Sequence, residues 1–308
     1  MKLKNDMGNA FKQDVHTSLR LIDTLIQPII LYASDFWGSL KLPQANPIEN
    51  LHMMMCKQLL GVQKQTTNIG VLLELGRLPL NISTIKAAIK NWERIKGGGA
   101  NTLLNASYED SMAHSLSWIT SIKSTLETNG MLDLFINDYP HKPPFIYKCI
   151  YQRLSDNFYQ TSFEAINKET SKLRTYALFK QASRCEKYLT VTKNVSVRTL
   201  VTKFRLSNHG LMIEIGRHSG TPKEARFCPF CLTEIETEFH FLWDCPTYSH
   251  LRNRFLNPTS RAFPGFNYLT NDMKIKLILS SMDENTCNYI AKASELRTFL
   301  TKNPKRTY

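Results

Sequence analysis

Four residues of metal-ligand type lie within one short segment of the chain. Cys228, Cys231, His240 and Cys245 form a C-x2-C-x8-H-x4-C pattern. A Cys-x2-Cys turn can place two thiolates on one ion, and a histidine and a cysteine five positions apart can add two ligands from the following turn. Four such ligands complete a tetrahedron with no open position for a catalytic water. The pattern therefore predicts a structural Zn²⁺ site, the alternative being a chance grouping in a chain with seven cysteines.

Basic residues are concentrated directly ahead of this segment. Residues 161–226 contain thirteen basic and five acidic side chains, within a chain of net charge +13 and pI about 9.4. Such an excess favours an anionic partner, most commonly RNA or DNA, although a merely basic soluble domain is the alternative. Eight side chains are candidates for phosphate contacts: Lys172, Arg174, Lys180, Arg198, Lys203, Arg205, Arg217 and Arg226.

Aromatic residues alternate with these basic ones, for example Tyr176, Phe179 and Phe204. They could stack on bases, or they could form the core face of helices whose other face is basic and solvated. Near the metal ligands, the apolar residues Phe239, Phe241, Leu242 and Trp243 are expected to supply a small core. We expect the nearby acids, Glu234, Glu236 and Glu238, to stay solvated.

The elements that must position these residues have helical periodicity, and no strand-type alternation of useful length occurs. We therefore expect an all-α fold, with a helical N-terminal half and a helical C-terminal half that carries a small zinc knuckle. Pro28 should kink or break the first helix. Further helices are expected at 80–96, 112–126, 145–166, 271–281 and 284–300, with a loop at 257–264 and joints at 97–99 and 141–144.

Composition shifts along the chain suggest five regions. They are a helical domain (1–97), a variable helical linker region (98–144), a basic helical region (145–226), the zinc knuckle (227–256) and a C-terminal helical tail (257–308).

The remaining cysteines, Cys56, Cys149, Cys185 and Cys287, are dispersed, as expected for free thiols in a reducing compartment. The first residues lack the apolar core of a signal peptide, and no apolar run reaches the length of a membrane span. We therefore expect an intracellular protein, nuclear or cytoplasmic and not secreted, with no membrane partner.

Residues 196–255 resemble the C-terminal region of reverse transcriptases from non-LTR (LINE-like) retrotransposons. The resemblance rests on an S-x-H-x-L-x-I-E-x-G-R segment, here from Ser207 to Arg217, followed by the four ligands. Residues 172–189 resemble a Y-x-x-F-K-x-x-aromatic-x-x-E-x-Y-L pattern of the same family, with Ser183 replacing the aromatic residue. Residues 21–38 and 66–82 resemble the segment that follows the polymerase palm, which implies that the helical domain at 1–97 is thumb-like.

The resemblance implies a fragment of a larger RNA-directed DNA polymerase that binds template RNA or target DNA and whose partners include the remainder of that enzyme. The family's polymerase holds two metal ions with adjacent aspartates, and this chain contains no Asp-Asp pair. No segment resembles a nuclease either, so we expect no catalytic residues and no enzymatic activity. The alternative function is a zinc-stapled helical protein-interaction module that does not bind nucleic acid.

Overall fold

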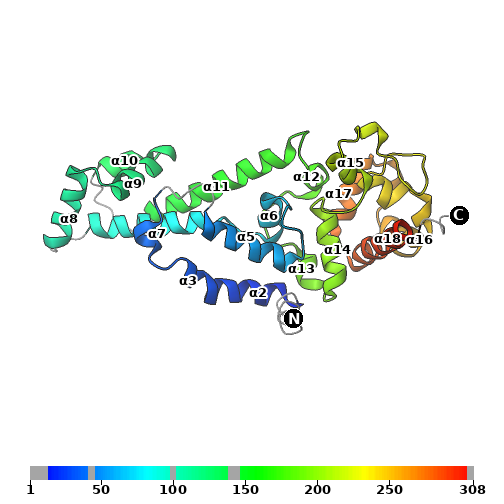
Figure 1. The fold of residues 1–308 in the computed structure, drawn as a ribbon, viewed down its shortest axis with the longest axis horizontal. Coiled ribbons are helices and arrows are strands. Elements are labelled where there is room, and N and C mark those ends of the chain that lie inside the picture. Colours follow the sequence, from blue (N-terminus) through cyan, green and yellow to red (C-terminus); the bar gives the residue numbers. More distant parts are fainter. Residues whose placement is uncertain (1–12, 41–45, 98–101, 138–145, 304–308) are drawn as a thin grey trace. The chain divides into compact units, whose positions relative to one another are not determined.

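Helices make up nearly all the regular structure in this computed structural model, which describes residues 13–40, 46–97, 102–137 and 146–303 (Figure 1). Within those ranges there is no β-strand, and only two isolated bridges occur, Leu75 with Cys185 and Phe227 with Ile235. The predicted all-α class is therefore confirmed. The joints expected at 98–99 and 141–144 lie outside the described residues.

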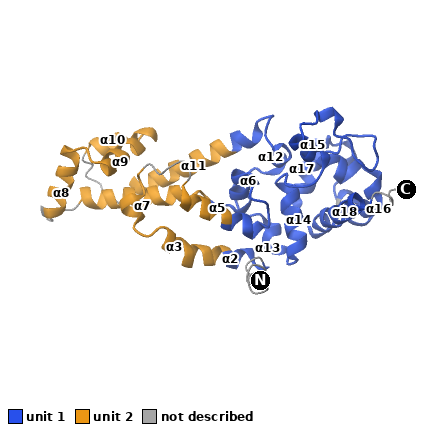
Figure 2. Ribbon diagram, viewed as in Figure 1, with its two compact units in different colours: residues 1–18, 55–77, 163–308 blue, residues 19–54, 78–162 orange. Residues whose placement is uncertain are grey.

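The chain divides into two compact units (Figure 2). Unit 1 comprises residues 1–18, 55–77 and 163–308, and unit 2 comprises residues 19–54 and 78–162. Three helices contribute residues to both units: α2 (Val15–Leu21), α5 (Pro47–Leu60) and α11 (Ile146–Asn167). This division does not follow the five regions suggested by composition, because each unit is assembled from segments that are separated in the sequence.

Unit 2 is built around the long helix α7 (Leu80–Lys96), which packs against α4, α8 and α9. The other elements of this unit are η1 (Ile22–Ile26), α3 (Gln27–Ile30), α4 (Ser34–Trp37), α8 (Thr102–Ala113), α9 (Ser117–Thr128) and α10 (Asp133–Ile136). The element η1 is a π-helical turn that ends two residues before Pro28. A proline lacks the N–H that an α-helix requires, so this change of hydrogen-bond register is where the expected distortion falls.

The core of unit 2 joins α7 to residues expected to form a linker. Trp92 on α7 stacks on Phe135, with ring centroids 5.7 Å apart. Ile119, Ile122 and Leu126 of α9 are buried against the same cluster. Residues 102–137 therefore contribute to the folded core of this unit.

Unit 1 contains the remaining helices, in which α14 and α16 pack on α18 and α12 packs on α17. Side-chain caps begin three of them, since Asn194, Thr270 and Asp283 accept hydrogen bonds from the first free backbone N–H groups. The helices are α6 (Asn68–Leu75), α12 (Arg174–Phe179), α13 (Lys187–Val191), α14 (Val195–Arg205), α15 (Met212–His218), α16 (Ser249–Arg261), α17 (Asn271–Ser281) and α18 (Glu284–Lys302), with short turns η3 (Lys223–Ala225), η4 (His240–Asp244), η5 (Pro246–Tyr248) and η6 (Phe266–Tyr268).

A buried carboxylate, Glu74 on α6, organises one half of unit 1. It accepts hydrogen bonds from Tyr176 Oη at 2.8 Å, from Tyr188 Oη at 2.7 Å and from Arg205 Nε at 2.6 Å. Burial raises the pKa of Glu74, but the guanidinium of Arg205 outweighs this effect and holds the pKa below its usual value. The ion pair is fully buried and fully hydrogen-bonded, which is the condition under which buried charges are tolerated.

The approach of α6 to the segment before α13 requires a glycine. Gly76 ends α6 with φ +63°, and a Cβ at this position would lie 2.4 Å from the backbone nitrogen of Cys185. This contact lets the Glu186 N–H donate to the Glu74 carbonyl at 3.1 Å. Gly76 therefore fixes the distance between the two segments that surround the Glu74 carboxylate.

Candidate metal centre

The structure brings the four predicted ligands together. One ligand atom from each of Cys228, Cys231, His240 and Cys245 lies within 4.8 Å of all the others. The Cys228 and Cys245 sulfurs are 3.9 Å apart, and Cys231 Sγ lies 3.4 Å from His240 Nε2. Three of the four residues are buried, so this cluster could bind a metal ion in a closed environment.

A tight turn and a π-helical turn explain the spacing of the ligands. The Cys228 N–H donates to the Glu234 carbonyl, and the Leu232 N–H donates back to the Cys228 carbonyl, which closes the turn that carries the first two cysteines. The other two ligands flank η4, where the Cys245 N–H donates to the His240 carbonyl at 2.9 Å. A π turn closes between residues five apart, so His240 and Cys245 reach the same side.

Neighbouring polar side chains orient the ligands. Glu234 Oε2 lies 3.0 Å from His240 Nδ1, which leaves Nε2 directed at the cysteines. The Thr233 hydroxyl donates to Cys231 Sγ at 3.3 Å. Burial lowers the pKa of His240, but its contacts with Cys228 and Glu234 raise the pKa more, to about 9. A carboxylate on the outer imidazole nitrogen is the usual support for a metal-bound histidine.

The knuckle is anchored to α18 by a carboxylate expected to be solvated. Glu236 is 0% exposed and accepts hydrogen bonds from Arg297 Nε and Nη2, both at 2.8 Å. Its Oε2 also accepts the Met212 N–H at 2.6 Å. The expectation of a solvated Glu236 was therefore wrong, because a buried arginine and a helix-start N–H satisfy its charge.

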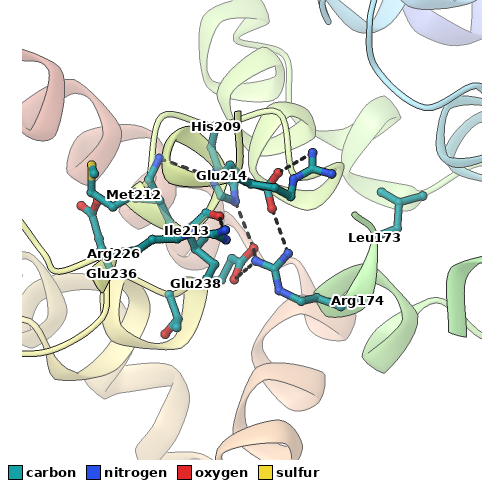
Figure 3. Close-up of polar contacts among 12 residues, drawn as sticks. Leu173, Arg174, His209, Met212, Ile213, Glu214, Arg226, Glu236 and Glu238 are labelled. Atoms are coloured by element: carbon teal, nitrogen blue, oxygen red, sulfur yellow. Dashed lines mark hydrogen bonds and ion pairs between the residues drawn. The ribbon is translucent and has the colours of Figure 1, made fainter. Parts of the chain in front are cut away.

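A second buried carboxylate joins the knuckle to α12. Arg174 Nη2 donates to Glu238 at 2.9 Å while Nη1 donates to Glu214 at 2.8 Å, so one guanidinium spans two acids (Figure 3). His209 Nε2 lies 3.3 Å from Glu238, and Arg217 pairs with Glu214 at 3.1 Å. Glu238 is also buried, against expectation, and its contacts with His209 and Arg174 overcome the effect of burial and lower its pKa to about 2.

The eight candidates for phosphate contacts fall into two groups. Lys180, Arg198 and Arg205 are buried and bonded to the protein itself: Lys180 to Glu186, Arg198 to the Thr192 carbonyl, and Arg205 to Glu74. These three are corrected to structural roles. Arg174 and Arg226 also donate to protein acceptors, Arg226 to the Thr221 and Ile213 carbonyls.

Lys172, Lys203 and Arg217 keep part of their side chains at the surface. They stay predicted phosphate contacts.

Sequence reasoning missed Glu74, Glu236, Glu238 and Arg297 as buried charged residues. Glu74 carried the only available signal, because it is an acid within the otherwise apolar run of α6. The aromatic residues Tyr176, Phe179 and Phe204 are buried, so they form the core face of their helices.

No protein-family model, curated protein or solved structure matches the chain. Among the described residues, no helix has the length and apolar character needed to cross a membrane.

Proposed function

We propose that the chain is a non-catalytic nucleic-acid-binding protein stabilised by a structural Zn²⁺ ion. The observation that carries this proposal is the separation of charge between the units. Unit 1, which contains the candidate metal centre, has 29 basic and 16 acidic residues, whereas unit 2 has ten of each. The whole net charge of +13 thus resides on unit 1, as suits binding to a phosphate backbone.

The donor set and its spacing support zinc as the metal. Zn²⁺ prefers four tetrahedral ligands of sulfur and nitrogen, at about 2.3 Å and 2.0–2.1 Å. These bond lengths place two sulfurs about 3.8 Å apart and a sulfur and a nitrogen about 3.6 Å apart. The corresponding distances here are 3.9 Å between Cys228 and Cys245 and 3.4 Å between Cys231 and His240.

The role of the ion would be structural. Bound between a turn and η4, it would hold together a segment whose acids Glu236 and Glu238 are anchored to α18 and α12. The resemblance to the C-terminal region of non-LTR reverse transcriptases supports the same proposal. Its signature residues Glu214 and Arg217 form an ion pair, and Tyr176 and Tyr188 both donate to Glu74.

Metal content tests the zinc assignment. Cys231→Ser should lose the ion, measured by elemental analysis of the purified protein, while Cys149→Ser, a cysteine of unit 2, should keep one equivalent. Equal zinc content in the two variants would refute the assignment.

Binding to a structured RNA and to a matched DNA duplex across a salt series tests the nucleic-acid proposal. The logarithm of affinity should fall linearly with the logarithm of salt concentration. Lys203→Glu should weaken binding and lower the slope, whereas Lys123→Glu, an equal charge change at an exposed position of α9, should have little effect. A flat salt dependence would rule the proposal out.

A protein-interaction module is the second candidate, favoured by one specific observation. Leu25, Ile29, Tyr32 and Phe36 lie within one short segment of unit 2, from η1 to α4, and are between 60% and 82% exposed. A group of large exposed apolar side chains is typical of a protein-binding surface. Under this alternative, Ile29→Asp should abolish binding to a protein partner and leave nucleic-acid affinity unchanged.

A further inference from the structure

Unit 1 contains a polar cleft of about 580 Å³ that the metal centre does not use. Its walls come from the loop before α6, the start of α12, the connection between α14 and α15, and α15 itself. Residues that contribute to it include Gln63, Lys172, Ser207, Asn208, Glu214 and Arg217. The volume falls in the range that encloses a small ligand such as a single nucleotide.

The charge lining the cleft is positive after its internal pairs are counted. Glu214 is the carboxylate of the wall, and it already pairs with Arg174 at 2.8 Å and with Arg217 at 3.1 Å. Lys172 adds a further cation. Burial lowers the pKa of Lys172, Glu214 opposes this shift, and Arg217 adds to it. An anion placed between Lys172 and Arg217 would offset the repulsion between the two side chains and favour the charged form of Lys172.

Ser207 supplies an independent sign of a ligand. It is 1% exposed, and its hydroxyl has no hydrogen-bond partner among the described residues. Buried hydroxyls without a partner are uncommon, because each forfeits the hydrogen bond that it would make in water. The residue also has φ +50°, a left-handed conformation that is unfavourable for a serine and recurs at ligand sites.

Amide side chains also line the cleft. The Asn208 amide donates to Thr66 Oγ1 at 2.6 Å, which ties the two walls of the cleft together. Gln63 and Gln65 are exposed at its rim. Such groups can donate to and accept from a sugar hydroxyl or a base edge.

We infer that this cleft binds one nucleotide of a nucleic-acid strand, with the phosphate between Lys172 and Arg217 and hydrogen-bonded to the Ser207 hydroxyl. The inference rests on the proposed function and gives it a location. Two cations and a hydroxyl match the charge and the acceptor oxygens of a phosphate group.

Single-stranded RNA binding to the full chain, measured by fluorescence anisotropy, tests this location. Lys172→Gln should weaken binding about tenfold, because a charge-assisted hydrogen bond is lost. Lys168→Gln removes the same charge from an exposed position four residues away, outside the cleft, and should weaken binding less than about twofold. Ser207→Ala should weaken binding about threefold without changing the salt slope, because it removes no charge. Equal losses for the two lysine variants would overturn the inference.

A second arm separates the cleft from the wider function. Adenosine monophosphate, but not adenosine, should protect Lys172 from acylation, detected by mass spectrometry of the full chain. The cleft is refuted, and the proposed function stands, if three results coincide. The RNA strand binds, adenosine monophosphate does not protect Lys172, and Lys172→Gln weakens binding no more than Lys168→Gln does. If the strand does not bind but adenosine monophosphate protects Lys172, the proposed function fails and the cleft is supported as a nucleotide site.

Discussion

Arg297 on α18 holds Glu236 of the knuckle through two parallel hydrogen bonds, Nε to Oε1 and Nη2 to Oε2, each 2.8 Å long. Neither carboxylate oxygen depends on water for a partner. The metal-ligand segment is therefore fixed to the last helix by a buried ion pair in addition to any ion that it binds.

Removing one partner of this ion pair should destabilise the folded protein. Arg297→Met leaves the Glu236 charge buried without its main partner and should lower the free energy of unfolding by about 3–5 kcal/mol. The double variant Arg297→Met, Glu236→Gln should recover part of the loss, since the orphaned charge is gone. Urea denaturation followed by circular dichroism measures both. Strictly additive losses would show that the two side chains do not interact energetically.

Two basic residues of α14 should behave differently despite lying two positions apart. Arg205→Met breaks the buried pair with Glu74 and should lower the free energy of unfolding by about 3–5 kcal/mol. Lys203→Met changes a partly exposed residue and should alter it by no more than about 0.5 kcal/mol. Thermal or urea unfolding of the two variants checks this contrast, which would vanish if Arg205 contributed only surface charge.

Glu234 should tune metal affinity without being a ligand. Glu234→Gln weakens the acceptor on His240 Nδ1, and loss of such support typically costs about 10–100-fold in affinity. Competition with a chromophoric chelator measures the change. Glu224→Gln, an exposed acid outside the cluster, is the matched control and should leave the affinity unaltered.

Unit 2 should lose stability as pH rises from about 4.5 to about 7. Glu93 is 5% exposed, and burial raises its pKa to about 7, although a hydrogen bond from the Tyr147 N–H opposes the shift. The folded state therefore binds a proton that the unfolded state releases near pH 4.5. Stability contributed by this proton is present below about pH 4.5 and is lost between there and about pH 7, by up to about 3 kcal/mol. Urea midpoints of Glu93→Gln should not fall across this window, whereas a parallel fall in both proteins would assign the titration elsewhere.

The helices that the sequence predicted most accurately were those with strong periodicity and clear ends. The expected ranges 80–96 and 271–281 coincide with α7 and α17. The single helix expected at 112–126 is instead two, α8 and α9, because Ser115 takes a left-handed conformation between them. The loop expected from Asn257 was wrong, since α16 continues to Arg261. Local sequence patterns did not locate this helix end.

The metal site could be predicted from the sequence, whereas the buried ion pairs could not. The four ligands lie within one short segment, so their spacing alone indicates a site. Arg205 and Glu74 are 131 positions apart, and nothing local distinguishes Arg205 from the exposed Arg217. The basic residues of a helix therefore cannot be sorted into structural and ligand-binding ones until their long-range partners are known.

The separation of Glu74 from Arg205 also constrains the order of folding. At a synthesis rate of about 5–20 residues per second, the ribosome adds the intervening 131 positions over roughly ten seconds. Residues 78–162 of unit 2 emerge in that interval and can form their own core first. Unit 1 closes last, when Arg205, Tyr176 and Tyr188 have all been made. A fragment that begins at residue 163 would keep Arg205 but lack the carboxylate it needs, so the knuckle and its basic helices should be expressed together with residues 55–77.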